Sequence, residues 1–175
     1  LVDDLYELAK SDAGSLSYRP VDVNPATILE DVVEQYRDDF AANNIAFEYH
    51  LDSSTPTSIH ADPDRLAQLF RNLLANMLRY TDGDGHARVS LRRGDNPATI
   101  EMHFEDSLPG VATDELEHLF QRFYRVEISR NRESGGAGLG LAICRNIVAA
   151  HGGQISADHS DLGGLHIRVS LPLNN

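Results

Sequence analysis

The chain has 175 residues, of which 41% are hydrophobic and 24% are charged, as expected for a globular domain with a core of its own. A net charge of −12 argues against nucleic acid or an anionic membrane as its partner. The single cysteine excludes an internal disulfide framework, and no apolar run is long enough to span a membrane.

The N-terminal residues 1–12 have the apolar spacing of a short helix. This helix is either the end of a longer one or a loosely docked terminal segment. Because the chain begins with Leu1 rather than methionine, we expect it to be part of a longer protein. A break at 13–15 leads us to expect the main domain over residues 13–175.

The first half of that domain contains two well-marked helices. A strand over residues 16–23 leads to Asn24 and Pro25, which together form a helix start. Alternating apolar residues predict a strand over 45–51, and a shorter strand ends at Ala61. Asp62 and Pro63 then open a helix with an almost uninterrupted apolar period.

The second half contains the remaining strands and one more helix. We expect strands near 86–93 and 98–105, an irregular stretch over 107–137 with a helical piece near 113–120, and a helix ending before Gly152. Strands near 153–159 and 164–173 complete the chain. The sequence therefore predicts an α/β two-layer sandwich, with three main helices on one face of a mixed sheet.

Four glycines in the segment 135–140 run directly into the last of these helices. Glycines let a backbone approach a ligand closely, and the free amides of a helix start attract phosphate. The segment lacks the lysine of a P-loop and the spacing of a dinucleotide fingerprint. Two interpretations remain open at this point: a phosphate-binding loop of another nucleotide fold, or a flexible linker.

Three further features are weak when each is taken alone. Asn72 and Asn76 share a helix face, where amide oxygens would suit Mg²⁺ or simply form a solvated flank. Asp106 follows an alternating strand, as an acceptor for an adenine amino group or as a turn residue. The segment 120–132 carries four arginines against one glutamate, which suits either a triphosphate lid or a solvated loop. The eight histidines show no metal-ligand spacing.

The order of these features resembles that of sensor histidine kinases of two-component systems. Segments similar to the N, G1, F and G2 boxes of that family are Asn72–Thr81, Asp106–Gly110, Phe120–Arg125 and Gly136–Leu141. The resemblance covers roughly residues 20–173, and Arg122–Arg125 with Ser129–Arg132 is similar to envelope-stress sensors of Gram-negative bacteria. It implies the Bergerat (GHKL) ATP-binding fold, whose sheet is mostly antiparallel.

This resemblance also implies an activity and a set of site residues. The chain would bind ATP and Mg²⁺ and transfer the γ-phosphoryl group to a histidine, mainly by positioning and charge neutralisation. The implied catalytic residues are Asn72, Asn76 and Arg79, with Asn76 and Asn72 at the metal. The implied adenine contacts are Tyr80, Asp106 and Gly110. The implied phosphate and lid residues are Arg79, Phe120, Phe123, Arg125, Arg130, Gly136, Gly138, Leu139, Gly140 and Leu141.

The chain departs from the family pattern in two places. Leu108 stands where the first glycine of the G1 box is usual, at the beginning of an implied lid over residues 107–137. No histidine has the phosphoacceptor context, so that histidine would lie upstream, on a dimerisation hairpin that ends at residues 1–12. The implied partners are this hairpin and a response regulator. The parent would be a homodimeric inner-membrane protein with this chain in the cytoplasm, and we expect the chain alone to be monomeric.

Three alternatives remain for the function. A gyrase- or Hsp90-type ATPase would need a glutamate at position 72, because an asparagine cannot act as a general base. An anti-sigma serine kinase shares the implied fold, although the N-terminal helical segment favours a dimerising histidine kinase. A nucleotide-binding module without activity is disfavoured by the presence of Asn76, Asp106 and the glycine loop.

Overall fold

The computed structural model of the chain describes residues 5–6, 9, 17–52, 58–96, 98–126 and 137–173. Most of the helix predicted over residues 1–12 lies outside these ranges. The central part of the predicted lid, residues 127–136, also lies outside them.

Five strands form the main sheet of the described chain. Their order across the sheet is β2 (Ala46–Leu51), β4 (His86–Arg93), β5 (Thr99–Ser107), β7 (Gly163–Pro172) and β6 (Gln154–His159). Strands β2 and β4 run parallel, whereas all the other neighbours are antiparallel. The prediction of a mixed, mostly antiparallel sheet is therefore confirmed.

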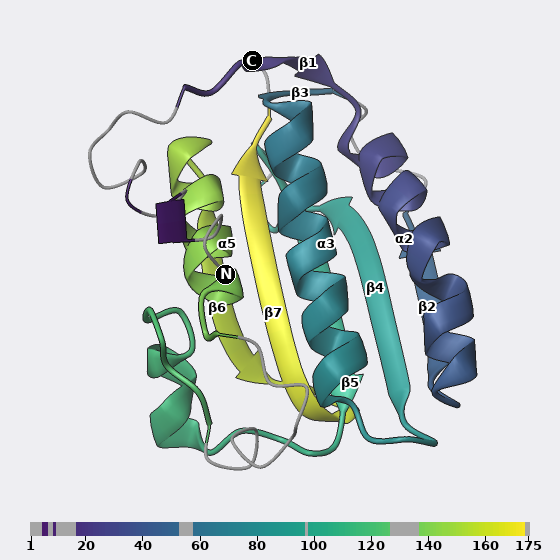
Figure 1. The fold of residues 1–175 in the computed structure, drawn as a ribbon. Helices are drawn as coiled ribbons and strands as arrows, with labels where there is room; N and C mark the ends of the chain where they lie inside the picture. The colour runs from purple at the N-terminus through teal and green to yellow at the C-terminus, as the bar shows by residue number, and fades with distance from the viewer. Residues whose placement is uncertain are drawn as a thin grey trace.

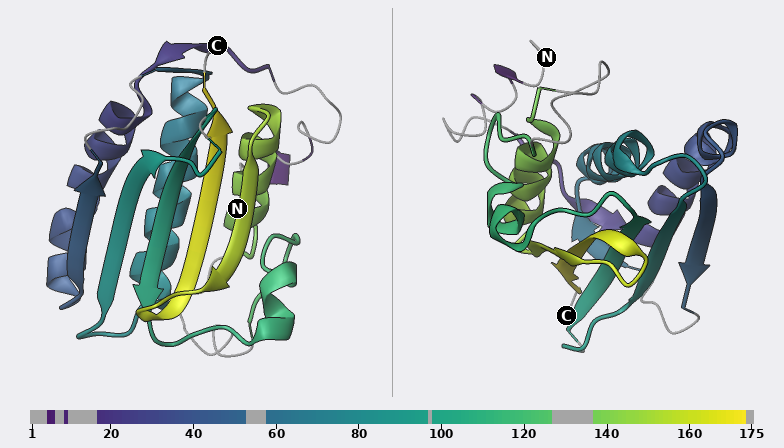
Figure 2. Two further views of the ribbon diagram at one scale, coloured as in Figure 1. Left: turned by 180° about the vertical axis from the view of Figure 1, so that it is seen from behind. Right: turned by 90° about the horizontal axis from the view of Figure 1, so that it is seen from below.

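Three helices pack on one face of this sheet: α2 (Pro25–Ala42), α3 (Pro63–Tyr80) and α5 (Gly140–Ala150) (Figure 1). Helix α3 lies between the other two and crosses the middle of the sheet. No described helix covers the opposite face, as the view from behind shows (Figure 2). The predicted two-layer sandwich with its helices on one side is confirmed.

The core lies between these layers and follows the two periods of the sequence. The apolar positions of α3 are all buried: Leu66, Leu69, Phe70, Leu73, Leu74 and Met77. Every second residue of the strands faces them, as Ile100, Met102 and Phe104 do on β5. Burying one such side chain contributes about 1.5–3 kcal/mol, so packing rather than helix propensity fixes the place of α3.

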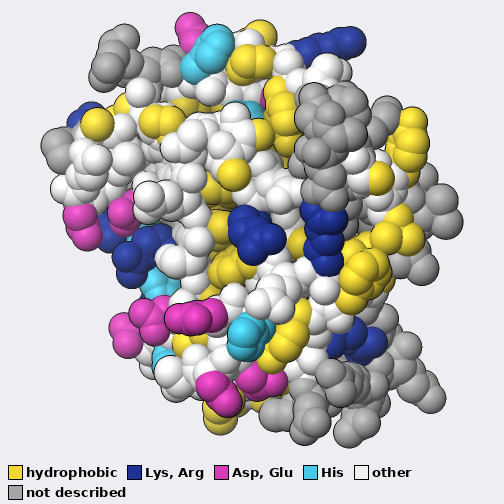
Figure 3. Space-filling model, turned by 90° about the vertical axis from the view of Figure 1, so that its left-hand side faces the viewer, with side chains coloured by type: hydrophobic (Ala, Val, Ile, Leu, Met, Phe, Trp, Pro, Cys, Tyr) yellow, Lys and Arg dark blue, Asp and Glu magenta, His cyan; other side chains and the backbone are white. Residues whose placement is uncertain are grey.

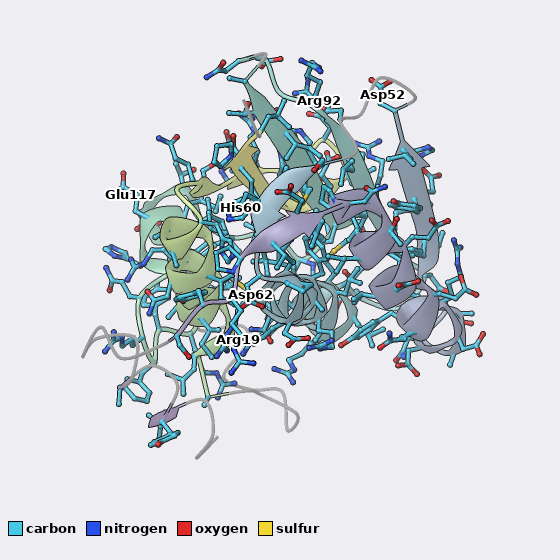
Figure 4. All side chains as sticks on the ribbon, turned by 90° about the horizontal axis from the view of Figure 1, so that it is seen from above. Arg19, Asp52, His60, Asp62, Arg92 and Glu117 are labelled. Carbon is cyan, nitrogen blue, oxygen red and sulfur yellow. The ribbon has the colours of Figure 1, made fainter. Side chains whose placement is uncertain are left out.

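Local signals determine where α3 begins. Asp62 caps the helix, because its Oδ1 accepts hydrogen bonds from the amides of Asp64 (3.0 Å) and Arg65 (3.2 Å). Its other carboxylate oxygen accepts from the amide of Arg19 at 2.8 Å, so the chain before β1 is tied to the same point (Figure 4). The cap fixes the register that places the polar residues of α3 further along the helix.

The strand predicted over residues 16–23 is the one clear difference among the described elements. The observed β1 contains only Val21–Val23, which pairs antiparallel with β3 (Ile59–Ala61) in a separate two-stranded sheet. The amide of Arg19 bonds to Asp62 instead of to a strand, and Pro20 has no amide hydrogen to donate. The helical piece predicted near 113–120 is a 3₁₀ helix, η1 (Thr113–His118).

Candidate functional site

A cavity of about 680 Å³ lies between α3, the start of α5 and the strands β5 and β7. The segments that contribute to it are far apart in the sequence, yet each carries one of the predicted motifs. The predicted residues that line the cavity are Asn72, Asn76, Arg79, Tyr80, Asp106, Gly110, Arg125, Gly138, Leu139, Gly140 and Leu141. The fold therefore brings the weak signals of the sequence together in one place.

Four predicted site residues are not found in this lining. Phe120 is buried but does not line the cavity, and the side chain of Phe123 is 61% exposed and does not line it either. Its backbone does contribute nearby, because its amide donates to the carbonyl of Gly138 at 2.9 Å. Arg130 and Gly136 lie outside the described residues.

Asp106, which is 7% exposed, lines the cavity. Its Oδ1 accepts a hydrogen bond from the amide of Leu165 at 2.7 Å. Burial raises the pKa of Asp106 to about 7, although the Leu165 amide acts in the opposite direction. A donor that enters the cavity would stabilise the ionised form, so the surroundings of Asp106 are suited to a ligand with an N–H group.

Backbone geometry explains how Asp106 reaches that position. The pairing of β5 with β7 shifts register between Glu105 and Ser107, so Asp106 lies at an irregularity in the strand. Gly164 on β7 faces it. A Cβ atom at Gly164 would lie 2.2 Å from Oδ1 of Asp106, so a larger residue there would displace the carboxylate.

The polar face of α3 lines the cavity as well. The side-chain amide of Asn72 donates to the carbonyl of Gly140 at 3.5 Å, which links α3 to the start of α5. Asn76 lines the cavity, and its side chain has no hydrogen-bond partner among the residues that the structure describes. Its amide oxygen is therefore available to a hard cation.

The start of α5 also lines the cavity. Gly138 has φ +72°, and a Cβ atom there would lie 2.8 Å from the carbonyl oxygen of Tyr124. Leu139 occupies the cap position without a side-chain cap, so the first amides of α5 keep their hydrogen-bonding capacity. Arg125 lines the same cavity. Free amides, a helix dipole and a guanidinium together favour an anion such as phosphate.

The view onto the α5 side shows dark-blue and magenta side chains together (Figure 3). The dark-blue side chains are arginines, because Lys10 is the only lysine of the sequence and lies outside the described residues. Two arginines, Arg79 and Arg125, line the cavity itself.

Several lining residues are apolar and were not identified from the sequence as parts of a site. They are Phe104, Val126, Leu119, Leu165, Ile167 and, with its polar tip, Tyr124. Phe104 and Ile167 are two residues from Asp106 and Leu165 on their strands, so they face the cavity with them. Strand alternation therefore contained the signal, but only once the pairing of β5 with β7 was known. These side chains provide a surface for a flat apolar group.

Leu108 does not enter the cavity, and its side chain is 62% exposed. Its carbonyl accepts from the amide of Asp82 at 3.1 Å. The non-glycine residues with positive φ in the described chain are Asn44, Asp84 and Phe123, so this conformation does not need a glycine at position 108.

Two further features are absent from the described part of the chain. It contains no group of three or more histidine, cysteine, aspartate or glutamate side chains that would hold a metal ion. A cation in the cavity would therefore depend on amide oxygens and on the ligand itself. Within the same residues, no helix combines the length and the apolar character that a membrane crossing requires.

Comparison with known proteins identifies relatives of this chain. Residues 61–175 match the family described as histidine kinase-, DNA gyrase B-, and HSP90-like ATPase. Over 173 residues the chain is 49% identical to the signal transduction histidine-protein kinase BaeS of Escherichia coli (strain K12), covering 99% of this chain and 36% of that protein. The chain spans less than half the length of the first curated relatives it matches, from 28% to 45% of each.

Solved structures show the same fold. Full-length ShkA in complex with AMPPNP superposes with a TM-score of 0.82 at 27% identity, covering 98% of this chain and 35% of that one. Histidine kinase ThkA in complex with the response regulator protein TrrA has a TM-score of 0.74 at 20% identity, covering 99% of this chain and 49% of that one. At that identity the second likeness shows the fold alone.

Proposed function

This chain belongs to the histidine kinase-, DNA gyrase B- and HSP90-like ATPase family as the catalytic ATP-binding domain of a sensor histidine kinase, and from that premise we propose that its cavity binds Mg-ATP and supplies a phosphoryl group to a histidine outside this chain. One observation carries the proposal. A single cavity is lined both by a buried carboxylate acceptor and by an uncapped helix start.

The adenine ring occupies the end of the cavity near Asp106. The carboxylate accepts a hydrogen bond from the exocyclic amino group, while the apolar faces of Phe104 and Ile167 contact the ring. Tyr80 and Gly110 line the same region and complete the base pocket. The complex with AMPPNP in the structural relative ShkA agrees with a nucleotide in this fold.

The triphosphate extends toward α5. The amides at Gly138, Leu139 and Gly140 bind the phosphate oxygens, and Arg79 and Arg125 neutralise their charge. Leu141 follows in the first turn of the helix. We assign Arg130 and Gly136 to the lid over these phosphates on the sequence resemblance alone, since both lie outside the described residues.

Asn76 holds the magnesium ion through its amide oxygen, and Asn72 supports it from the preceding turn. Donor chemistry supports this assignment, because Mg²⁺ prefers oxygen ligands and usually keeps several waters. When bound, the ion supplies charge neutralisation between the phosphates. Asn72 also holds the start of α5 through Gly140, which keeps the two sides of the phosphate site together.

The transfer step needs little acid–base chemistry from this chain. A nitrogen of the acceptor imidazole bonds to the γ-phosphorus while the bond to the bridging oxygen breaks, leaving ADP, and the imidazole proton passes to solvent. Positioning and electrostatic stabilisation provide the catalysis. An asparagine at position 72 cannot activate water as a general base, which favours transfer over hydrolysis.

We propose the following organisation for the longer protein that contains this chain. Residues 1–12 end its dimerisation and phosphoacceptor hairpin, and residues 13–175 form the catalytic domain with a lid over 107–137. The phosphoryl group then passes to a response regulator in envelope-stress signalling. The parent is a homodimer of the bacterial inner membrane with this domain in the cytoplasm, and the isolated chain is monomeric.

A trans-phosphorylation assay tests the proposed reaction. The chain is mixed with the separately expressed helical hairpin of the same parent protein and with radiolabelled Mg-ATP. We expect label on the hairpin that is lost in acid and retained in base, as phosphohistidine requires. Replacement of the acceptor histidine by alanine in the hairpin should remove the label.

The same assay distinguishes the alternatives. Acid-stable label on an added substrate would indicate a serine kinase. Rapid release of phosphate without labelled protein would indicate an ATPase of the same fold. Bound nucleotide without either product would indicate a binding module.

A further inference from the structure

A partly buried polar cluster lies on the face of the sheet that no described helix covers. Successive residues of a strand point to opposite faces, so His103 and Glu105 lie behind the cavity that Phe104 and Asp106 line. His103 is 7% exposed although it stands on the open face. We define the outer-face cluster as Arg88, Arg92, Glu101, His103, Glu105 and His166.

The hydrogen bonds of this cluster determine the protonation of both histidines. Nε of Arg92 lies 3.1 Å from Nε2 of His103, and an arginine can only donate, so that ring nitrogen carries no proton. The proton of neutral His103 is then on Nδ1, which lies 2.9 Å from Nε2 of His166 and donates to it. Both rings are neutral in this arrangement.

Protonation would disrupt this arrangement. A proton on Nε2 of His103 would remove the acceptor for Arg92 and place two cations together, although Glu101 at 3.3 Å would then accept from the ring. A proton on Nε2 of His166 would remove the acceptor for His103. Since neither nitrogen can gain a proton without breaking a bond, the pair is stable only in its neutral form.

Charged groups face the pair from every strand around it. They are Arg88 and Arg92 on β4, Glu101 and Glu105 on β5, Arg168 on β7, Asp158 on β6, and Asp161 in the turn between β6 and β7. The strongest local bonds of the acidic groups already go to arginines, with Arg88 and Glu105 joined at 2.8 Å and Arg92 and Glu101 at 2.9 Å.

Burial, the facing ring and Arg92 together lower the pKa of His103, and burial is the main cause of the lowered pKa of His166. A histidine with a lowered pKa stabilises the folded state above the pKa of the unfolded chain, near 6.5. That stabilisation is lost as the pH falls below this value.

The pair is directly connected to the base end of the cavity. His166 is opposite Glu105 in the pairing of β5 with β7, at the last regular step before the register shift. The next residue toward the register shift is Asp106 on β5 and Leu165 on β7. The amide of Leu165 donates to the carboxylate of Asp106 at 2.7 Å and so orients it. If the two histidines lost contact, the hydrogen bond between Leu165 and Asp106 would be the first to weaken.

We infer that His103 and His166 are positioning residues for nucleotide binding: their neutral hydrogen bond holds β5 against β7 beside Asp106, and acidification opens it. The inference rests on the proposed function only for its effect on nucleotide. The effect on the strands belongs to the free protein and is measured without a ligand.

The test compares the wild-type chain with the double variant His103→Gln/His166→Gln. Glutamine at 103 accepts from Arg92 and donates to glutamine at 166, but neither side chain titrates. We measure hydrogen exchange of the Leu165 amide at pH 7.5 and 5.5, corrected for the intrinsic exchange rate. We expect wild-type protection to fall more than that of the double variant, because only the wild-type pair titrates and its pKa values are lowered in the folded state.

His50→Gln is the matched control, because His50 lies on β2 of the same sheet with a side chain that is 61% exposed. The protection of the Leu165 amide in His50→Gln should depend on pH as it does in the wild type. ADP affinity, measured in parallel, should fall more steeply on acidification in the wild type than in the double variant. Absence of ADP binding in every protein would contradict the proposed function, while the exchange data would still decide the role of the pair.

An equal loss of Leu165 protection in wild type and double variant would overturn the inference. If the double variant does not fold, the ring signals of wild-type His103 and His166 are followed by NMR. Titration of both rings below the ordinary histidine range, together with loss of Leu165 protection, supports the inference. Independent titration of each ring near pH 6.5 overturns it.

Discussion

At the scale of single residues, Asp106 makes the sharpest prediction. A hydrogen bond to a charged group contributes about 1.5–3 kcal/mol, so Asp106→Asn should weaken ATP binding by about 10- to 150-fold. The ionised carboxylate is a stronger acceptor for the adenine amino group than the neutral acid, and burial raises the pKa of Asp106 to about 7. Wild-type affinity should therefore decline as the pH falls from 8 to 6.5, as calorimetric titration would measure.

The variant is also the control for the pH effect. Asparagine does not titrate, so the affinity of Asp106→Asn should change little over the same pH interval. Similar pH profiles for the two proteins would show that Asp106 does not contact the base.

Asn76 should determine the dependence of binding on magnesium. Asn76→Ala removes an oxygen ligand and should abolish the increase in ATP affinity that Mg²⁺ provides, without loss of the fold. Arg71→Ala is the matched control, because Arg71 lies on the same helix and does not line the cavity. Titrations with magnesium and with EDTA provide the comparison. An unchanged magnesium effect in Asn76→Ala would remove this residue from the metal site.

At the scale of elements, Gly138 and Gly140 are two positions in the phosphate loop at which alanine should have different effects on stability. Gly138→Ala introduces a Cβ 2.8 Å from a backbone oxygen at φ +72°, so it should lower the free energy of unfolding by about 1–3 kcal/mol. A Cβ at Gly140 meets nothing within 4 Å, so Gly140→Ala should leave that free energy nearly unchanged. Urea denaturation of both variants measures the difference. Equal stabilities would show that the turn does not require glycine at 138.

The elements that local chemistry specifies could be predicted from the sequence. Helix α3 follows from the cap at Asp62, from Pro63 and from an uninterrupted apolar period, and the same period places Asn72 and Asn76 on one face. Asp106 was predicted as a hydrogen-bond acceptor because it follows an alternating strand. Short-range rules are sufficient for these cases because the determining contacts lie within a few residues.

Features that depend on pairing across the sheet could not be predicted. The apolar floor of the cavity needs the register of β5 against β7, and the bond between His103 and His166 joins residues 63 positions apart. The strand predicted over 16–23 was too long because the Arg19 amide bonds to Asp62, which is 43 residues away. Local patterns contain no information about such distant partners.

At the scale of the whole molecule, the two-layer architecture separates two environments. The helix side holds the cavity between α3 and α5, and the open side of the sheet holds the outer-face cluster. The chain carries a net charge of −12, so an anionic ligand must be attracted by local groups rather than by the overall charge. The arginines and the helix start beside the cavity provide that attraction.

Amide chemical-shift mapping with magnesium and a non-hydrolysable ATP analogue shows directly whether the cavity binds nucleotide. We expect saturable shifts at Gly138, Leu139, Gly140 and Leu141, with a second group around Asp106 and Leu165, while α2 stays nearly unchanged. Both groups line one cavity, so a single bound nucleotide that fills it should shift the amides of both. Absence of saturable shifts, or shifts confined to residues away from the cavity, would contradict the assignment of this cavity as the ATP site.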